Sequence, residues 1–281
     1  MALAFFRIFA GLPFTGRVTG GMIRLPMAGL WMVSSFWLYQ FALVCAAGAG
    51  LGLYLSAVSS KRPGRTIDFG IAFLLGALIG GRFVFVLIVR DAFRAQWTDA
   101  FLLWNGGFDF AGAAAGGLLG LWVYARVRKA SFRDAASEIT PLAGALAVSV
   151  WLGCWLSGIA YGPVSSAAGG LPAPDAFGAI AWRFPLQAIG AAGGSVFLWL
   201  GRFLRKKYAH CFAPGMDLGL VLAGNAALAF GLFFLRADFS PMWHNIRVEM
   251  WEAGAVFLMA FFLFVLAGVY GRSSSSGDTR D

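Results

Sequence analysis

The apolar stretch LLGALIGGRFVFVLIVR, residues 74–90, is followed closely by a second one, LWNGGFDFAGAAAGGLLGL, residues 103–121. Both contain paired glycines, Arg82 lies inside the first and Asp109 lies near the start of the second. A charged side chain at membrane depth is costly, so it usually faces a cavity or a partner and marks a functional site. Glycine pairs let helices approach closely. We therefore expect a closely packed helix pair with a polar site beside it, and a helical bundle built around the two.

The composition of the whole chain indicates a membrane protein. Of its 281 residues, 59% are hydrophobic and only 12% are charged, whereas an average soluble domain has about 25% charged residues. Several apolar runs exceed the roughly 18 residues that span a bilayer. The sequence therefore predicts an all-α, polytopic integral membrane protein.

Seven transmembrane helices are expected within a transmembrane domain of residues 36–270. Their predicted ranges are 36–57, 67–89, 108–125, 139–160, 185–201, 216–235 and 251–270. Residues 1–35 are interpreted as an interfacial lead-in, and the polar residues 271–281 as a disordered tail. Residues 161–185 are rich in Gly, Pro and Ala, which favours a loop.

The distribution of basic residues predicts the orientation. Lysine and arginine are more numerous in the loops after the first, third and fifth helices and in the tail than in the lead-in and the other loops. The positive-inside rule then places the N-terminus outside and the C-terminus in the cytoplasm. The net charge of +9 thus reflects topology and attraction to anionic headgroups, and no nucleic-acid partner is expected.

The cysteines and histidines indicate neither a metal site nor a cofactor. Cys45, Cys154 and Cys211 are far apart and share no metal-ligand spacing, and His210 and His244 fall in predicted loops. Since zinc sites need clusters of such ligands, we expect no metal and free thiols.

Several short motifs occur in a particular order along the chain. They are GGR at residues 80–82, WNGGFDFAG at 104–112, SF at 131–132 with PL at 141–142, and RFPLQ at 183–187. In order and spacing they resemble the bacterial prolipoprotein diacylglyceryl transferases, over about residues 36–270. The resemblance implies a multi-pass protein of the bacterial inner (plasma) membrane.

The resemblance also implies a reaction and its partners. The family transfers a diacylglyceryl group from phosphatidylglycerol to the thiol of a lipoprotein cysteine, which requires groups that hold the lipid phosphate and a base for the thiol. The expected partners are phosphatidylglycerol or another anionic phospholipid, together with a lipoprotein precursor or a membrane partner protein. Under this reading Arg82, Arg183, Gln187 and Arg236 bind the lipid, and Asp109 is the catalytic base.

The chain departs from the family where the family's polar residues lie. A histidine is replaced by Ala111, an arginine by Trp151, and two asparagines by Cys154 and Ser157. A glutamate falls on Gly158 or Ile159, a Tyr-Glu pair on Ile189-Gly190, and an arginine and a glutamate near Ala229 and Phe233. A second hypothesis is therefore a catalytically inactive relative that serves as a lipid-binding or protein-docking membrane subunit.

The individual residues also keep alternative interpretations. Arg82 binds a lipid phosphate, or it pairs with Asp109 or with helix-end carbonyls. Asp109 is a base, or it pairs with Arg82 or lies in headgroup water. Gln187 and Asn225 favour hydrogen bonds between helices, with lipid contact next. The glycine series from Gly106 onward lacks the Gly-Lys-Ser/Thr ending of a phosphate loop, so we expect tight helix packing.

Overall fold

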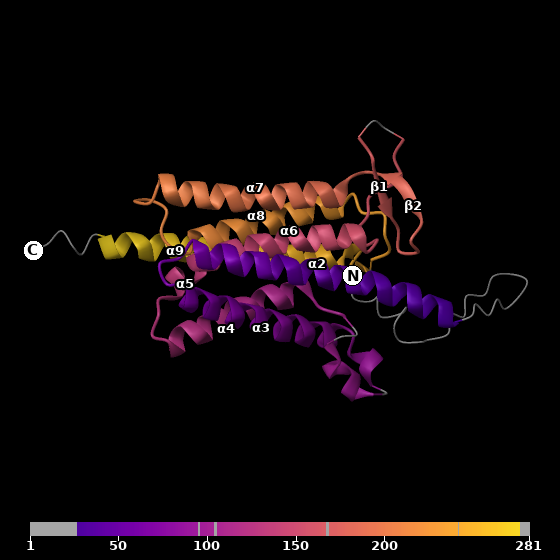
Figure 1. The fold of residues 1–281 in the computed structure, drawn as a ribbon, viewed down its shortest axis with the longest axis horizontal. Helices are drawn as coiled ribbons and strands as arrows, with labels where there is room; N and C mark the ends of the chain where they lie inside the picture. The colour runs from indigo at the N-terminus through magenta and orange to yellow at the C-terminus, as the bar shows by residue number, and fades with distance from the viewer. Residues whose placement is uncertain (1–26, 95, 104–105, 167–168, 241, 276–281) are drawn as a thin grey trace, which may run out of the picture.

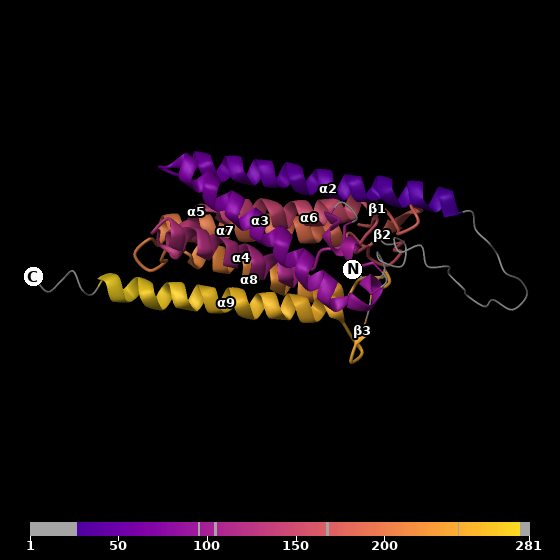
Figure 2. The same ribbon diagram turned by 90° about the horizontal axis from the view of Figure 1, so that it is seen from below.

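The computed structural model describes residues 27–94, 96–103, 106–166, 169–240 and 242–275. Its long helices run side by side along one common axis (Figure 1). They are α2 (Met27–Val58), α3 (Pro63–Ile88), α4 (Phe110–Val127), α6 (Thr140–Leu156), α7 (Leu186–Lys207), α8 (Met216–Phe233) and α9 (Val248–Ser275). The short helix α5 (Phe132–Glu138) precedes α6. Figure 2 shows α2 and α9 on opposite sides of the bundle, with the other helices between them.

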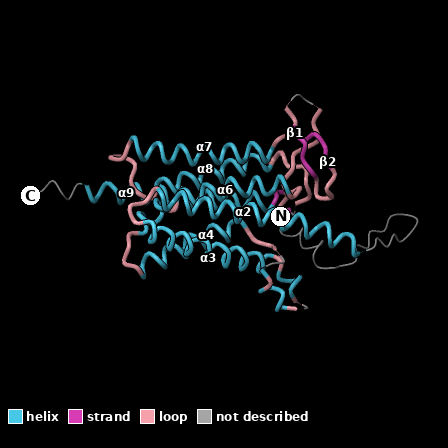
Figure 3. Tube along the Cα trace, in the orientation of Figure 1, coloured by secondary structure: helices cyan, strands magenta, loops and turns pink. Residues whose placement is uncertain are grey.

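The short elements gather in the connections at one end. They are the 3₁₀ turns η1 (Arg90–Phe93) and η2 (Trp97–Phe101), and the hairpins β1 (Leu171–Pro174) with β2 (Ile180–Arg183) and β3 (Met242–Trp243) with β4 (Ile246–Arg247). We call this end the hairpin end; its described residues are 89–94, 96–103, 106–109, 157–166, 169–185, 234–240 and 242–247. The opposite end, residues 59–66, 126–133 and 202–215, is the basic end (Figure 3). The predicted orientation places the hairpin end outside and the basic end in the cytoplasm.

The predicted class, an all-α polytopic membrane protein, is confirmed. In the described residues, five helices are long and apolar enough to cross a membrane: α2, α3, α4, α8 and α9. Helices α5 and α6 form a sixth span if they count as one, with a bend of 48° between them. Helix α7 does not meet the same hydropathy criterion, and it ends in Arg205, Lys206 and Lys207. The count of seven and the orientation therefore stay predictions.

Some helix boundaries differ from the predicted ones. Helix α2 is described from Met27, so residues 27–35 of the predicted lead-in are helical. Helix α6 ends at Leu156, before a glycine with a positive φ of 62° at Gly158. Helix α9 continues to Ser275. Residues 1–26 and 276–281, the rest of the predicted lead-in and tail, lie outside the described residues.

The expected close packing of the glycine-rich helices is confirmed. A Cβ atom added to Gly116 of α4 would lie 2.3 Å from the carbonyl oxygen of Gly76 in α3, and one added to Gly80 would lie 2.5 Å from the carbonyl oxygen of Gly112. These distances are shorter than van der Waals contact, so the two backbones touch directly. The glycines therefore bring Gly81 and Arg82 of α3 against the start of α4.

Replacing Gly116 with leucine will destabilise the protein by about 1–3 kcal/mol, because the side chain meets rigid backbone on α3 and forces the helices apart. The measurement is thermal unfolding in detergent. Gly231→Leu is the control, since nothing lies within 4 Å of a Cβ at Gly231. Equal melting temperatures for the two variants would contradict direct backbone packing.

Candidate functional site

Arg82 is buried at the hairpin end and uses its whole guanidinium group within the protein. All five of its N–H groups are donated to backbone carbonyls of the connection between α3 and α4. The acceptors are Asp99 and Ala100, both at 2.7 Å, Gly107 at 3.1 Å, Leu102 at 3.3 Å, and Gly106. A phosphate could bind Arg82 only by replacing one of these carbonyls. Of the alternatives from the sequence, the structure has the pairing with helix-end carbonyls, since Asp99, Ala100 and Leu102 lie at the end of η2, and Gly106 and Gly107 of the following loop add two more.

Asp109 is buried at the start of α4 and does not form an ion pair with Arg82. Its carboxylate caps α4 by accepting from the backbone N–H of Gly112 at 2.5 Å, and its own N–H donates to Gly81 at 2.9 Å. The carboxyl group of Glu252, on α9, lies beside that of Asp109. This carboxyl pair is the most base-like arrangement near the predicted site.

Gln187, Arg183 and Arg236 converge on one short segment, residues 159–161, which follows α6. Gln187 donates its amide N–H to the carbonyl of Ile159 at 3.1 Å. Arg183 lies over the ring of Tyr161, with 4.4 Å between the guanidinium carbon and the ring centroid. Arg236 reaches the segment through Asp238, which accepts from the N–H of Ala160 at 3.1 Å. The structure thus brings three of the four predicted lipid-binding residues together and leaves Arg82 apart from them.

The segment is held in a strained conformation by these contacts. Ala160 has a φ of 54°, which costs an L-residue about 1–2 kcal/mol. Such strain persists where the surroundings over-determine the backbone, as they often do at functional sites. Here the carbonyl of Tyr161 also accepts from the N–H of Ala237 at 2.9 Å.

Arg236 is the centre of a buried charge network. Its side chain is 1% exposed and forms two parallel hydrogen bonds, at 2.8 and 2.6 Å, with the carboxylate of Asp238. Glu249 of α9 lies 3.7 Å from it, and Arg247 donates to the carbonyls of Arg236 and Asp238. Burial opposes the charge of Arg236, but the Asp238 and Glu249 carboxylates outweigh it, and the pKa of Arg236 is raised.

Arg183 has the spare hydrogen-bonding capacity that Arg82 lacks. It pairs with Asp175 at 3.3 Å while its side chain is only 8% exposed, and its Nε–H is buried without a hydrogen-bond partner. Burial raises the pKa of Tyr161 beneath it, and the Asp238 and Asp175 carboxylates add to this effect. The phenol therefore stays neutral and can donate a hydrogen bond. An anion or a polar headgroup is the partner that these donors would accept.

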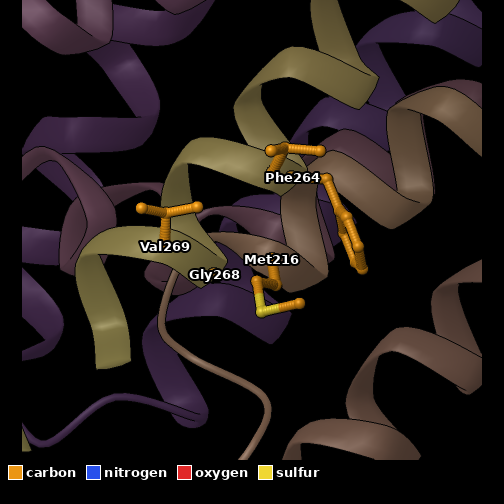
Figure 4. Close-up of a pocket in the computed structure, with 5 residues that line it drawn as sticks. Met216, Phe264, Gly268 and Val269 are labelled. Atoms are coloured by element: carbon orange, nitrogen blue, oxygen red, sulfur yellow. The ribbon is translucent and has the colours of Figure 1, made fainter. Parts of the chain in front are cut away.

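A separate cavity lies elsewhere in the bundle. It measures about 440 Å³ and is lined by Met216 of α8 and by Phe264, Val265, Gly268 and Val269 of α9, at the basic end (Figure 4). It contains none of the predicted site residues. Within the described ranges, no group of three or more His, Cys, Asp or Glu side chains could hold a metal ion.

The model of one protein family, prolipoprotein diacylglyceryl transferase, matches residues 28–266. The chain belongs to this family. A relative from Streptomyces coelicolor, named phosphatidylglycerol–prolipoprotein diacylglyceryl transferase 1, is 29% identical over 219 residues, which cover 73% of this chain and 61% of the relative. A Streptomyces avermitilis transferase is 26% identical, covering 87% of this chain and 74% of its own length. A transferase from Cupriavidus pinatubonensis is 25% identical over a match that covers 85% of this chain and 90% of the relative.

Membership confirms the family that the motifs indicated and, together with the helices that can span a membrane, a multi-pass protein of the bacterial inner membrane. The match covers α2 to α8 and most of α9. The chain spans less than two thirds of the Streptomyces coelicolor relative.

Five of the residues at which the sequence analysis expects a departure from the family lie in one apolar cluster. Trp151, Cys154, Ile159 and Ala229 are buried together, and Phe233 packs against them with its ring centroid 6.3 Å from that of Trp151. The indole of Trp151 also covers Gly190: a Cβ there would lie 2.3 Å from the indole ring. Residues of α6, α7 and α8 that are far apart in the sequence thus pack against one another.

Several acidic residues of the site are absent from the sequence-based candidates. Asp238 follows Arg236 by two positions, and Glu249 and Glu252 lie three apart on α9, hence on one helix face. Glu252 could have been recognised, because it lies inside the predicted seventh helix, where a carboxyl group is costly. The role of Asp238 depends on the turn after α8, which no sequence pattern indicated.

Proposed function

We propose that this protein binds the phospholipid of its family's reaction, phosphatidylglycerol or another anionic phospholipid, at the hairpin end, and that it does so without transferring the diacylglyceryl group. The observation that carries the proposal is the apolar cluster around Trp151. Its residues stand at positions where the motif comparison in the sequence analysis expects the family's arginine, asparagine and glutamate side chains.

The chemistry of transfer explains why this cluster matters. The thiol must lose a proton, the resulting thiolate must attack the glycerol carbon, and the C–O bond to the phosphate must break as glycerol phosphate leaves. The leaving phosphate needs several donors, and losing one such donor typically costs about 10²–10³ in rate. Trp151, Ala229 and Phe233 offer no cation or carboxylate for any of these steps.

The polar residues that remain support binding. Arg183 has a buried N–H without a partner, and it lies on the phenol ring of Tyr161 beside Asp175. A phosphate or glycerol oxygen would satisfy the N–H, and the planar guanidinium suits phosphate oxygens. Gln187 and Arg236 would act by fixing the segment of residues 159–161 on which the ring of Tyr161 is carried.

A second candidate function is the transfer reaction itself. It is favoured by the carboxyl pair of Asp109 and Glu252, which could take up the thiol proton, and by the family match over residues 28–266. In that case the catalytic base lies on α4 or α9. The positions at which the family's asparagine and glutamate are expected lie on α6 and just after it.

A transfer assay with lipid analysis distinguishes the two functions. The purified protein in detergent receives phosphatidylglycerol and a lipoprotein peptide that carries a cysteine. We expect no thioether product, while phosphatidylglycerol binds and its affinity falls about tenfold or more in Arg183→Gln, since hydrogen bonds to charged groups have this magnitude. Arg90→Gln, at the exposed turn η1 of the same end, is the control.

Two results would count against the proposal. Thioether formation that is lost in Asp109→Asn would establish the second candidate. Phosphatidylglycerol binding that falls equally in Arg183→Gln and Arg90→Gln would remove the reason to place the lipid at Arg183.

A further inference from the structure

A cavity at the basic end is lined mainly by cations. It measures about 300 Å³, and its lining residues are Arg65, Val127, Arg128 and Lys129. Arg65 lies in the first turn of α3, Val127 is the last residue of α4, and Arg128 and Lys129 follow it. No carboxylate lines this cavity, and no ion pair described in the structure includes these three cations.

Arg65 has a donor that the protein itself does not satisfy. Its Nε–H is buried and has no hydrogen-bond partner, and its guanidinium carbon lies 5.1 Å from the centroid of the Phe69 ring. A buried donor without a partner costs free energy, and in a native structure it often indicates a missing water, ion or ligand.

An aromatic pair fixes the positions of two of the cations. The rings of Phe69 and Tyr124 meet edge to face, 5.9 Å apart, and the guanidinium of Arg128 lies 6.0 Å from the centroid of the Tyr124 ring. The nearby carboxylates have other partners: Asp68 accepts from the hydroxyl of Tyr124 at 3.1 Å, and Glu138 accepts from Thr66 at 2.6 Å.

Lys129 occupies a backbone position that normally belongs to glycine. Its φ is 50°, its N–H donates to Arg126 at 3.1 Å, and the N–H of Ala130 donates to Ala125 at 2.8 Å. This is the Schellman pattern of a helix C-terminus, in which Gly or Asn usually takes the left-handed residue. A lysine is strained there, and such strain is characteristic of functional sites.

We propose that this cavity is a binding site for a phosphate group. The fork of Arg65 and the ammonium of Lys129 supply the donors, Arg128 adds charge, and the 70% exposed Val127 supplies an apolar contact beside them. The phosphate comes from a phospholipid headgroup at the membrane surface or from a soluble phosphate. This site lies at the opposite end of the bundle from Arg183 and does not depend on the function proposed above.

The test measures the binding of two probes to the full-length protein in neutral detergent at one low salt concentration. The probes are a short-chain phosphatidylglycerol and inorganic phosphate. Arg65→Gln and Lys129→Gly should each weaken binding about tenfold or more. Lys129→Gly should also raise the melting temperature, because glycine removes the strain at this position. The matched controls are Arg62→Gln and Lys61→Gly, which remove exposed charges that do not line the cavity.

The outcomes separate the sources of the phosphate and can overturn the site. Binding of the lipid alone identifies a phospholipid headgroup, and equal binding of both probes identifies a soluble phosphate. Equal losses in the site variants and the controls would mean that diffuse surface charge attracts the anion, and the proposal would fail. It would fail as well if neither probe bound to the unsubstituted protein.

Discussion

Replacing Arg82 with methionine will destabilise the protein by about 3–5 kcal/mol, the loss expected when one partner is removed from a buried charged network. Methionine keeps much of the apolar stem but donates no hydrogen bond. Five carbonyls of residues 99–107 would lose their donor. The rings of Phe85 and Phe93, 5.5 and 5.6 Å from the guanidinium carbon, would lose their cation as well.

The measurement combines thermal unfolding with limited proteolysis of the connection between α3 and α4. Cleavage within residues 90–107 should become faster, because Arg82 is the residue that joins this connection to α3. The stability and protease resistance of Arg82→Lys should lie between those of the unsubstituted protein and Arg82→Met, since an ammonium has three donors and a guanidinium has five. Arg90→Met, at an exposed position, is the control. A variant with unchanged stability and protease resistance, but without bound phospholipid, would show that Arg82 acts on lipid and not on the loop.

Replacing Asp238 with alanine will also cost about 3–5 kcal/mol, because it leaves Arg236 charged and buried with only Glu249, at 3.7 Å, beside it. The pKa of Arg236 is raised by its carboxylate partners. The stability linked to its proton is therefore fully present below the ordinary arginine pKa, and it is lost only as the pH rises through the raised value. At neutral pH the effect of Asp238→Ala comes from the missing carboxylate alone.

An exposed ion pair provides the control for this prediction. Arg94 and Asp91 lie 2.9 Å apart with side chains that are 71% and 75% exposed. Asp91→Ala should change the melting temperature little, because solvent screens such pairs. The double variant Arg236→Met with Asp238→Ala should recover part of the loss, since the buried charge of Arg236 is removed together with its main partner. Equal effects of Asp238→Ala and Asp91→Ala would contradict the buried network.

The sequence indicated the positions of the helices because bilayer insertion depends on local composition. An apolar run of sufficient length predicts a helix wherever it occurs, and α3, α4, α8 and α9 have such runs. The glycine pairs of α3 and α4 also predicted their own contact, because removing a side chain has one main consequence on a helix surface, a close approach. The motifs likewise predicted the family, which the match over residues 28–266 confirms.

The partners of the charged residues depended on the tertiary structure. The sequence singled out Arg82 and Asp109 as buried charges, but whether they pair with each other depends on the path of the loop between them. That loop turns its carbonyls toward Arg82, and Glu252 of α9 reaches Asp109. Likewise, the sequence does not indicate that Trp151, Gly190 and Phe233 are in contact. Their contact depends on the packing of α6, α7 and α8 against one another. Local hydrophobicity determines which segments enter the membrane, whereas hydrogen bonds and packing between distant segments determine what each buried polar group can still bind.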